Sequence, residues 1–234
     1  MRLSVRPAIL RLACLSFLLA GLVPAAASAA CTSRPGAGVD WSGCQKMRLI
    51  LRGANLSGAN LARADLFSTD LSGANLEGAH LMNAHIAQAW FQEANLRAAN
   101  LTKAYGSRVN FEAASLVGAI VVKAELPRAN LARADLTNAD LSKSDLGRAA
   151  LTGAHLEGAN LSKTILARAH FSGAKMTGAD LTTAYTLLAR FTGTDLSGTV
   201  GLTQTQLDDA CGDDTTVLPP GLNKPASWPC PEEE

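Results

Sequence analysis

Ala54-Asn55-Leu56-Ser57-Gly58 and Ala59-Asn60-Leu61-Ala62-Arg63 follow one another in the sequence, and the same pattern continues to Leu196 without an insertion or a deletion. Numbered by their middle residues, these are 29 pentads centred on positions 56 to 196. The middle residue is Leu, Ile, Val, Phe or Met in 27 pentads, and the residue two places before it is Ala in 24. One large and one small apolar side chain therefore recur in every pentad.

A period of five fits neither the 3.6-residue period of an α-helix nor the two-residue period of a strand. A solenoid accommodates it, because each pentad can form one side of a coil and point its large and small apolar residues inward. The low aromatic content of 5% agrees with an interior built from Leu and Ala.

The pattern resembles the pentapeptide-repeat family, whose signature is a small residue, Asp or Asn, Leu or Phe, and two small or polar residues. The resemblance implies an all-β fold, a right-handed quadrilateral β-helix with four pentads, or 20 residues, per coil. At this register the 29 pentads would make about seven coils.

The distribution of basic residues supports a 20-residue coil independently. Two places after the pentad centre, Lys recurs at every twentieth residue, and so does Arg one pentad later. The eight positions are Lys103, Lys123, Lys143, Lys163, Arg108, Arg128, Arg148 and Arg168. Each series would form a vertical column.

The flanks of the repeat divide the chain further. Arg2, Arg6 and Arg11, an apolar run over 12–23 and small residues before Ala30 are typical of a Sec signal peptide. The run is too short to span a bilayer, and the sequence predicts no transmembrane segment. We predict a cleaved signal peptide (1–30), an N-terminal cap (31–50), the β-helix (51–200) and a C-terminal cap with its tail (201–234).

Removal of the signal leaves four cysteines, Cys31, Cys44, Cys211 and Cys230. An even number in an oxidising compartment favours two disulfides, and their positions favour Cys31 with Cys44 and Cys211 with Cys230, one in each cap. A lipid anchor on Cys31 is the alternative. The expected location is the periplasm or the exterior.

The C-terminal cap contains a helix signal. Thr203 and Gln206 have capping-box spacing, and Gly212 is the expected helix stop. Trp41 is large enough to cover the open N-terminal coil.

Catalytic and metal-binding machinery is not predicted. The four histidines, His80, His85, His155 and His170, all precede a pentad centre, and no two of them are 20 residues apart. The sequence therefore predicts no catalytic residues, no metal site and no cofactor.

The basic columns have two interpretations. They can form a ladder that grips a linear polyanion, or they can be a solvated surface that Glu125 and Asp145 partly neutralise. Like charges stacked one coil apart are unfavourable, which favours a role beyond solubility.

Gly106 and Thr186 replace the large centre residue, and each follows a tyrosine, Tyr105 or Tyr185. The tyrosine rings could refill the interior, or the chain could bulge. Tyr105 and Tyr185 are candidate contacts on a distorted coil.

These observations favour an exported, non-enzymatic solenoid that serves as a structural or protein-interaction scaffold in the cell envelope. The alternative is a polyanion-binding module for an acidic polysaccharide, lipopolysaccharide or nucleic acid. The expected partner is a protein or an anionic envelope component, and the chain is a monomer or a homodimer. The resemblance also brings in members that imitate DNA and bind a topoisomerase, but those are strongly acidic, whereas this chain carries a net charge of +1.

Overall fold

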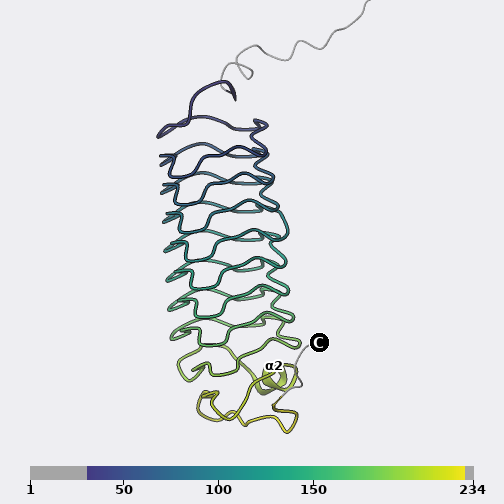
Figure 1. Cartoon of the computed structure of the whole chain (residues 1–234). Coiled ribbons are helices and arrows are strands. Elements are labelled where there is room, and N and C mark those ends of the chain that lie inside the picture. The colour runs from purple at the N-terminus through teal and green to yellow at the C-terminus, as the bar shows by residue number, and fades with distance from the viewer. Residues whose placement is uncertain (1–30, 230–234) are drawn as a thin grey trace, which may run out of the picture.

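The computed structural model describes residues 31–229, and within them the chain winds into a tall tower of stacked coils (Figure 1). Parallel pairing joins residues 20 apart, from Asp40 with Asn60 to Asp180 with Val200. Four such ladders begin at Asp40, Gln45, Ile50 and Asn55, so each coil has four sides. The 20-residue register predicted from the basic columns is confirmed. The pairing also starts inside the segment predicted as the N-terminal cap.

Each side of a coil contains one paired residue and one turn. Asp135 donates its backbone N–H to the Ala114 carbonyl (2.9 Å) in the preceding coil, and Leu136 donates to the His155 carbonyl (2.7 Å) in the next. The chain then turns, and Ala139 donates back to the Leu136 carbonyl (2.9 Å). Because a turn follows every paired residue, pairing occurs through isolated bridges, and the described residues contain no extended strand.

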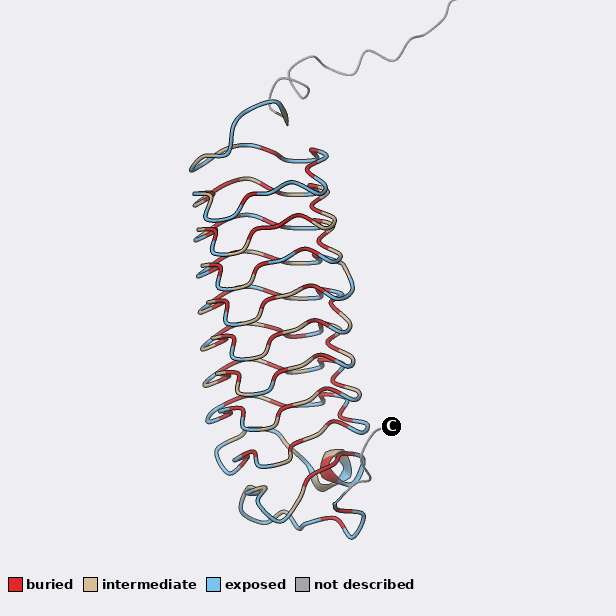
Figure 2. Cartoon of the chain, viewed as in Figure 1, coloured by how far each residue is buried: buried red, intermediate tan, exposed pale blue. Residues whose placement is uncertain are grey.

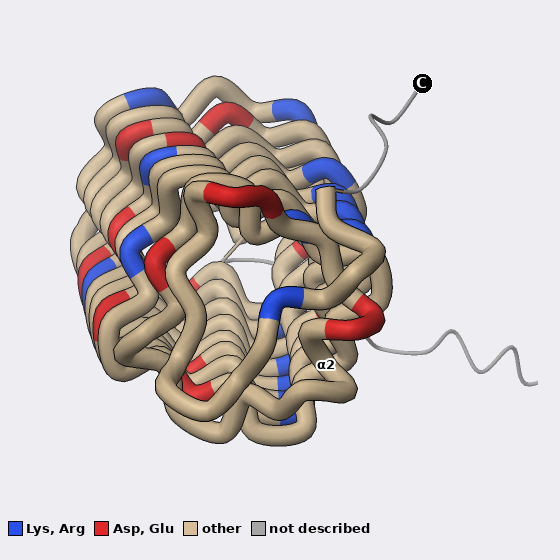
Figure 3. The backbone as a smooth tube through the Cα atoms, turned by 90° about the horizontal axis from the view of Figure 1, so that it is seen from below, with Lys and Arg blue, Asp and Glu red and all other residues tan. Residues whose placement is uncertain are grey.

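The pentad centres and the small residues two places before them fill the interior, which Figure 2 shows as buried segments recurring in every coil. Phenylalanine rings stack in this core, with centroids 5.0 Å apart for Phe91 with Phe111 and also for Phe171 with Phe191. Where Thr replaces the small Ala, its hydroxyl donates to a carbonyl 23 residues earlier, as in Thr164 to Leu141 (3.0 Å). These polar exceptions are therefore satisfied. Viewed along its axis, the tower shows the coils stacked in register (Figure 3).

Two pentad centres, Gly106 and Thr186, lack a large apolar side chain, and the structure gives each a different explanation. Gly106 has a φ of 155°, and a Cβ built there would lie 2.6 Å from the Ala87 Cα, so the backbone itself closes up against the preceding coil. Thr186 is buried, and its hydroxyl donates to the Gln206 carbonyl (2.7 Å) in the C-terminal cap. The Tyr105 and Tyr185 side chains are 46% and 50% exposed. The tyrosine rings therefore do not refill the interior.

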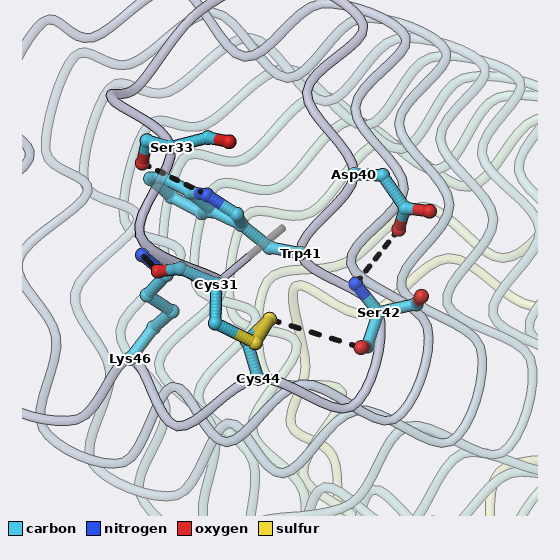
Figure 4. Close-up of a disulfide and its surroundings, with 7 residues drawn as sticks. All are labelled: Cys31, Ser33, Asp40, Trp41, Ser42, Cys44 and Lys46. Carbon is cyan, nitrogen blue, oxygen red and sulfur yellow. Dashed lines mark hydrogen bonds between the residues drawn. A yellow bond between two sulfur atoms is a disulfide. The ribbon is translucent and has the colours of Figure 1, made fainter. Parts of the chain in front are cut away.

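The N-terminal end is closed by a small polar and aromatic cluster (Figure 4). Trp41 is buried, and the Lys46 ammonium lies 3.8 Å from the centre of its ring while donating to the Cys31 carbonyl (2.7 Å). Burial lowers the pKa of Lys46. The predicted Cys31–Cys44 disulfide is present, with the two Cα atoms 5.4 Å apart. Cys211 is buried, but its expected partner Cys230 lies outside the described residues, so the second bridge stays a prediction.

The N-terminal disulfide is expected to stabilise the first coils. Its cysteines are 13 residues apart, and closing a loop of this size in the unfolded chain is worth about 3 kcal/mol. A Cys31→Ser/Cys44→Ser variant should therefore unfold at lower temperature, and hydrogen exchange should rise first in residues 39–60. An unchanged melting temperature together with unchanged exchange would show that the bridge contributes nothing.

The C-terminal end is closed by helix α2 (Gln204–Asp208). The predicted capping box is confirmed, because Thr203 and Gln206 each bond the other's backbone N–H. The Gln206 amide also donates to the Leu181 and Ala184 carbonyls (2.8 and 2.9 Å), which fastens the helix to the last complete coil.

The prediction that Gly212 ends the helix is wrong, because α2 ends at Asp208 and Asp209 is its C-cap. Gly212 instead makes room for Trp228: a Cβ there would lie 2.5 Å from the ring atom Cε3. The Trp228 indole donates to the Ala210 carbonyl (2.8 Å). Among residues 31–229, no helix is long and apolar enough to cross a bilayer.

Candidate ligand-binding face

The basic columns occupy the turns at two neighbouring corners of the tower. Lys103, Lys123, Lys143 and Lys163 lie at one corner, and the four Arg residues, each five residues further along, lie at the next. All eight side chains are exposed. We call these eight residues the basic ladder, and the side between the corners, which contains positions 105, 125, 145, 165 and 185, the basic face. In Figure 3, basic segments recur in successive coils.

Every residue of the basic ladder has a left-handed backbone, with φ between 57° and 63°. This conformation costs an L-residue with a side chain roughly 1–2 kcal/mol, and glycine avoids the cost. The other two corners mostly use glycine at the equivalent position, namely Gly53, Gly73, Gly153, Gly173 and Gly193 at one and Gly58, Gly78, Gly118, Gly158 and Gly178 at the other. The backbone therefore gives no reason for Lys and Arg at the ladder.

Within the part of the chain that the structure describes, the basic ladder also lacks direct ion pairs. Among residues 31–229, none of its eight cations lies within 4.0 Å of a carboxylate oxygen. Asp145 accepts instead from the Gly147 N–H (2.8 Å). Elsewhere on the tower, Arg52 pairs with Asp70 and Arg133 with Glu112. The interpretation of the ladder as a paired surface is therefore not supported.

A shallow depression of about 310 Å³ lies beside the Arg corner. Arg128, Arg148 and Arg168 line it together with Asp145. Its other lining residues, Pro127, Gly147 and Ala167, directly precede the arginines in the turns, and none of them has a long side chain. An anionic group can therefore approach several guanidinium groups without a steric barrier.

An aromatic stack lies at the N-terminal end of the basic face. The Tyr105 ring stacks on His85 with centroids 5.0 Å apart, and His85 stacks on Phe67 at 5.8 Å. The His85 Nδ1 lies 3.0 Å from an Asp65 carboxylate oxygen. This stack was not predicted. The 20-residue spacing of His85 and Tyr105 is visible in the sequence, but the sequence analysis tested only whether two histidines are 20 residues apart.

Tyr105 and Tyr185, the two candidate contacts, are both on the basic face but do not come together, since four coils separate them. Of the histidines, His155 lies 3.7 Å from Glu157. Within the described part of the chain, no group of three or more His, Cys, Asp or Glu residues could hold a metal ion.

Comparison with known proteins gives one family and several related structures. The sequence model described as "Pentapeptide repeats" matches in eight copies over residues 51–83, 79–105, 107–142 and 144–182, together more than half of the chain. The chain matches no curated protein.

Three solved structures illustrate the likeness. HetL, a pentapeptide repeat protein involved in heterocyst differentiation regulation in the cyanobacterium Nostoc, is 30% identical over 79% of this chain and 91% of its own (TM-score 0.30). The fluoroquinolone resistance protein QnrB1 is 20% identical over 74% and 84% (TM-score 0.36). A pentapeptide repeat protein of the Arabidopsis thaliana thylakoid lumen is 33% identical over 50% and 68% (TM-score 0.23).

Proposed function

Because the chain belongs to the pentapeptide-repeat family, we propose that it is an exported, non-enzymatic scaffold of the cell envelope that works by presenting its outer surface to a partner. The filled interior supports this proposal, because the apolar side chains that define the pentads are buried, whereas the basic ladder lies on the outside. Export is supported by the signal-peptide pattern and by the disulfide, which suits an oxidising compartment. The same disulfide engages the Cys31 sulfur that a lipid anchor would require.

We further propose that the ligand contacted by the scaffold is anionic. The observation that carries this proposal is the basic ladder, in which eight exposed cations, without a carboxylate partner among residues 31–229, occupy positions that suit glycine better. Rows of cations along stacked coils recur at the roughly 4.8 Å spacing of paired strands and match a ligand with regularly repeated anionic groups. A DNA-mimicking function would instead require an acidic face.

Retention on an immobilised linear polyanion tests the ligand proposal. We expect the mature protein to bind a dextran sulfate column at low salt and to elute as the salt concentration rises, because salt screens exposed charges. A variant with all eight ladder residues replaced by Glu should pass through the column. Melting curves would verify that it is folded, and equal retention of the two folded proteins would contradict the proposal.

A further inference from the structure

The basic face ends in an exposed apolar patch on its C-terminal side. The patch consists of Ile165, Tyr185, Leu187 and Leu188, with exposed fractions of 45%, 50%, 38% and 38%. We call these four residues the apolar end. Exposed apolar side chains that gather in one place, rather than singly, mark a surface that meets another molecule.

The apolar end is a direct continuation of the basic ladder. Ile165 and Tyr185 are paired neighbours in the ladder of bridges that runs along the basic face. Leu188 occupies the coil position that follows Arg168 at the Arg corner, and the Arg168 N–H donates to the Leu187 carbonyl (2.9 Å). Cationic and apolar side chains therefore lie on one continuous surface.

Neither the interior nor the local backbone explains these apolar residues. Thr186, which lies among them in the chain, is buried and bonded to the C-terminal cap, whereas its neighbours point outward. Leu188 has a φ of 56°, where glycine would be less strained. The Leu188 N–H donates to the Asp209 carbonyl (2.6 Å), so the C-terminal cap holds this corner in place.

A ligand that suits the whole surface must be anionic along four coils and apolar from the last of these coils onward. A soluble acidic polysaccharide or a nucleic acid would leave the apolar end in water. An anionic bilayer offers phosphate groups to the cations and hydrocarbon to apolar side chains that reach the interface. We propose that the basic face and the apolar end together bind the surface of an anionic lipid membrane; this inference rests on the proposed anionic ligand.

Vesicle co-sedimentation of the full mature protein tests the inference. The vesicles contain either phosphatidylcholine alone or equal parts of phosphatidylcholine and phosphatidylglycerol. The apolar variant carries Ile165→Thr, Leu187→Ser and Leu188→Gly, the last chosen because glycine suits the left-handed backbone. Its matched control replaces three other exposed apolar residues, Met47→Ser, Met82→Ser and Ile120→Thr.

We expect native protein to bind the anionic vesicles and not the neutral ones. Replacing three ladder cations by Gln should weaken this binding by about a hundredfold, at about fivefold per cation. The apolar variant should lose about tenfold in vesicle affinity with no change in its affinity for soluble dextran sulfate, since only the membrane offers hydrocarbon. The control variant should match the native protein in both assays.

The outcomes separate the two proposals. If the native protein binds dextran sulfate but not anionic vesicles, or if the apolar variant binds vesicles as tightly as the native protein, the membrane inference is wrong and the anionic-ligand proposal stands. If the native protein binds neither probe, both are wrong.

Discussion

Replacing Leu136 by Asp is expected to abolish the folded tower at neutral pH. The Leu136 side chain is fully buried between neighbouring coils, so the new carboxyl group would have no water and no cationic partner. At pH 7, keeping the buried carboxyl group neutral costs about 4 kcal/mol, because the group must hold its proton about three units above its unperturbed pKa of about 3.9. Loss of the leucine adds about 1.5–3 kcal/mol. The sum approaches the whole stability of an ordinary domain, roughly 5–15 kcal/mol.

Thermal unfolding followed by circular dichroism measures this loss. Asn138→Asp is the matched control, because it places the same side chain on the outside of the same coil at an exposed position. Since protonation removes the charge, the defect of Leu136→Asp should shrink as the pH falls towards about 3.9, the unperturbed pKa of Asp. If Leu136→Asp melts at the same temperature as the control, Leu136 does not belong to the core.

Gly106→Leu is expected to destabilise the protein, although leucine is the commonest residue at the other pentad centres. A Cβ at this position would lie 2.6 Å from the Ala87 Cα, and a backbone atom cannot move aside as a flexible side chain can. Overpacking and the unfavourable φ of 155° together should cost about 3 kcal/mol or more.

The control for Gly106→Leu is Gly118→Ala, which tests an unfavourable backbone without a clash. Gly118 has a φ of 64°, and nothing lies within 4 Å of a Cβ built there. This change should cost only about 1–2 kcal/mol. A Gly106→Leu protein that melts at or above the native temperature would show that position 106 is an ordinary gap in the core.

Much of the architecture follows from the sequence because one register is repeated without interruption. The apolar period of five and the 20-residue spacing of Lys103 with Lys123 give the interior, the coil length and the corners at which the cations lie. The capping box of α2 was also predictable, because it depends on two residues three apart.

The exceptions were not predictable, because each depends on a contact between coils or with a cap. Thr186 looked like a defect until the C-terminal cap supplied the Gln206 carbonyl that its hydroxyl bonds. Gly212 had the signature of a helix stop, but its role is set by Trp228, 16 residues away in the chain. The left-handed backbone of the basic ladder had only an indirect signal in the sequence, namely that glycine recurs at the same pentad position elsewhere, as at Gly58 and Gly73.

The most direct test of the basic face is a comparison of two triple variants with equal changes in net charge. One replaces Arg128, Lys143 and Arg148 by Glu within the ladder, and the other replaces Arg34, Arg97 and Lys175 by Glu elsewhere. Equilibrium affinity for a short dextran sulfate oligomer is measured for both and for the native protein. We predict that only the ladder variant loses affinity, because each substitution removes a cation that contacts the polyanion, and that its affinity depends less on salt. If both variants lose the same affinity, binding depends only on the net charge of the protein and not on the basic ladder, which would contradict the account.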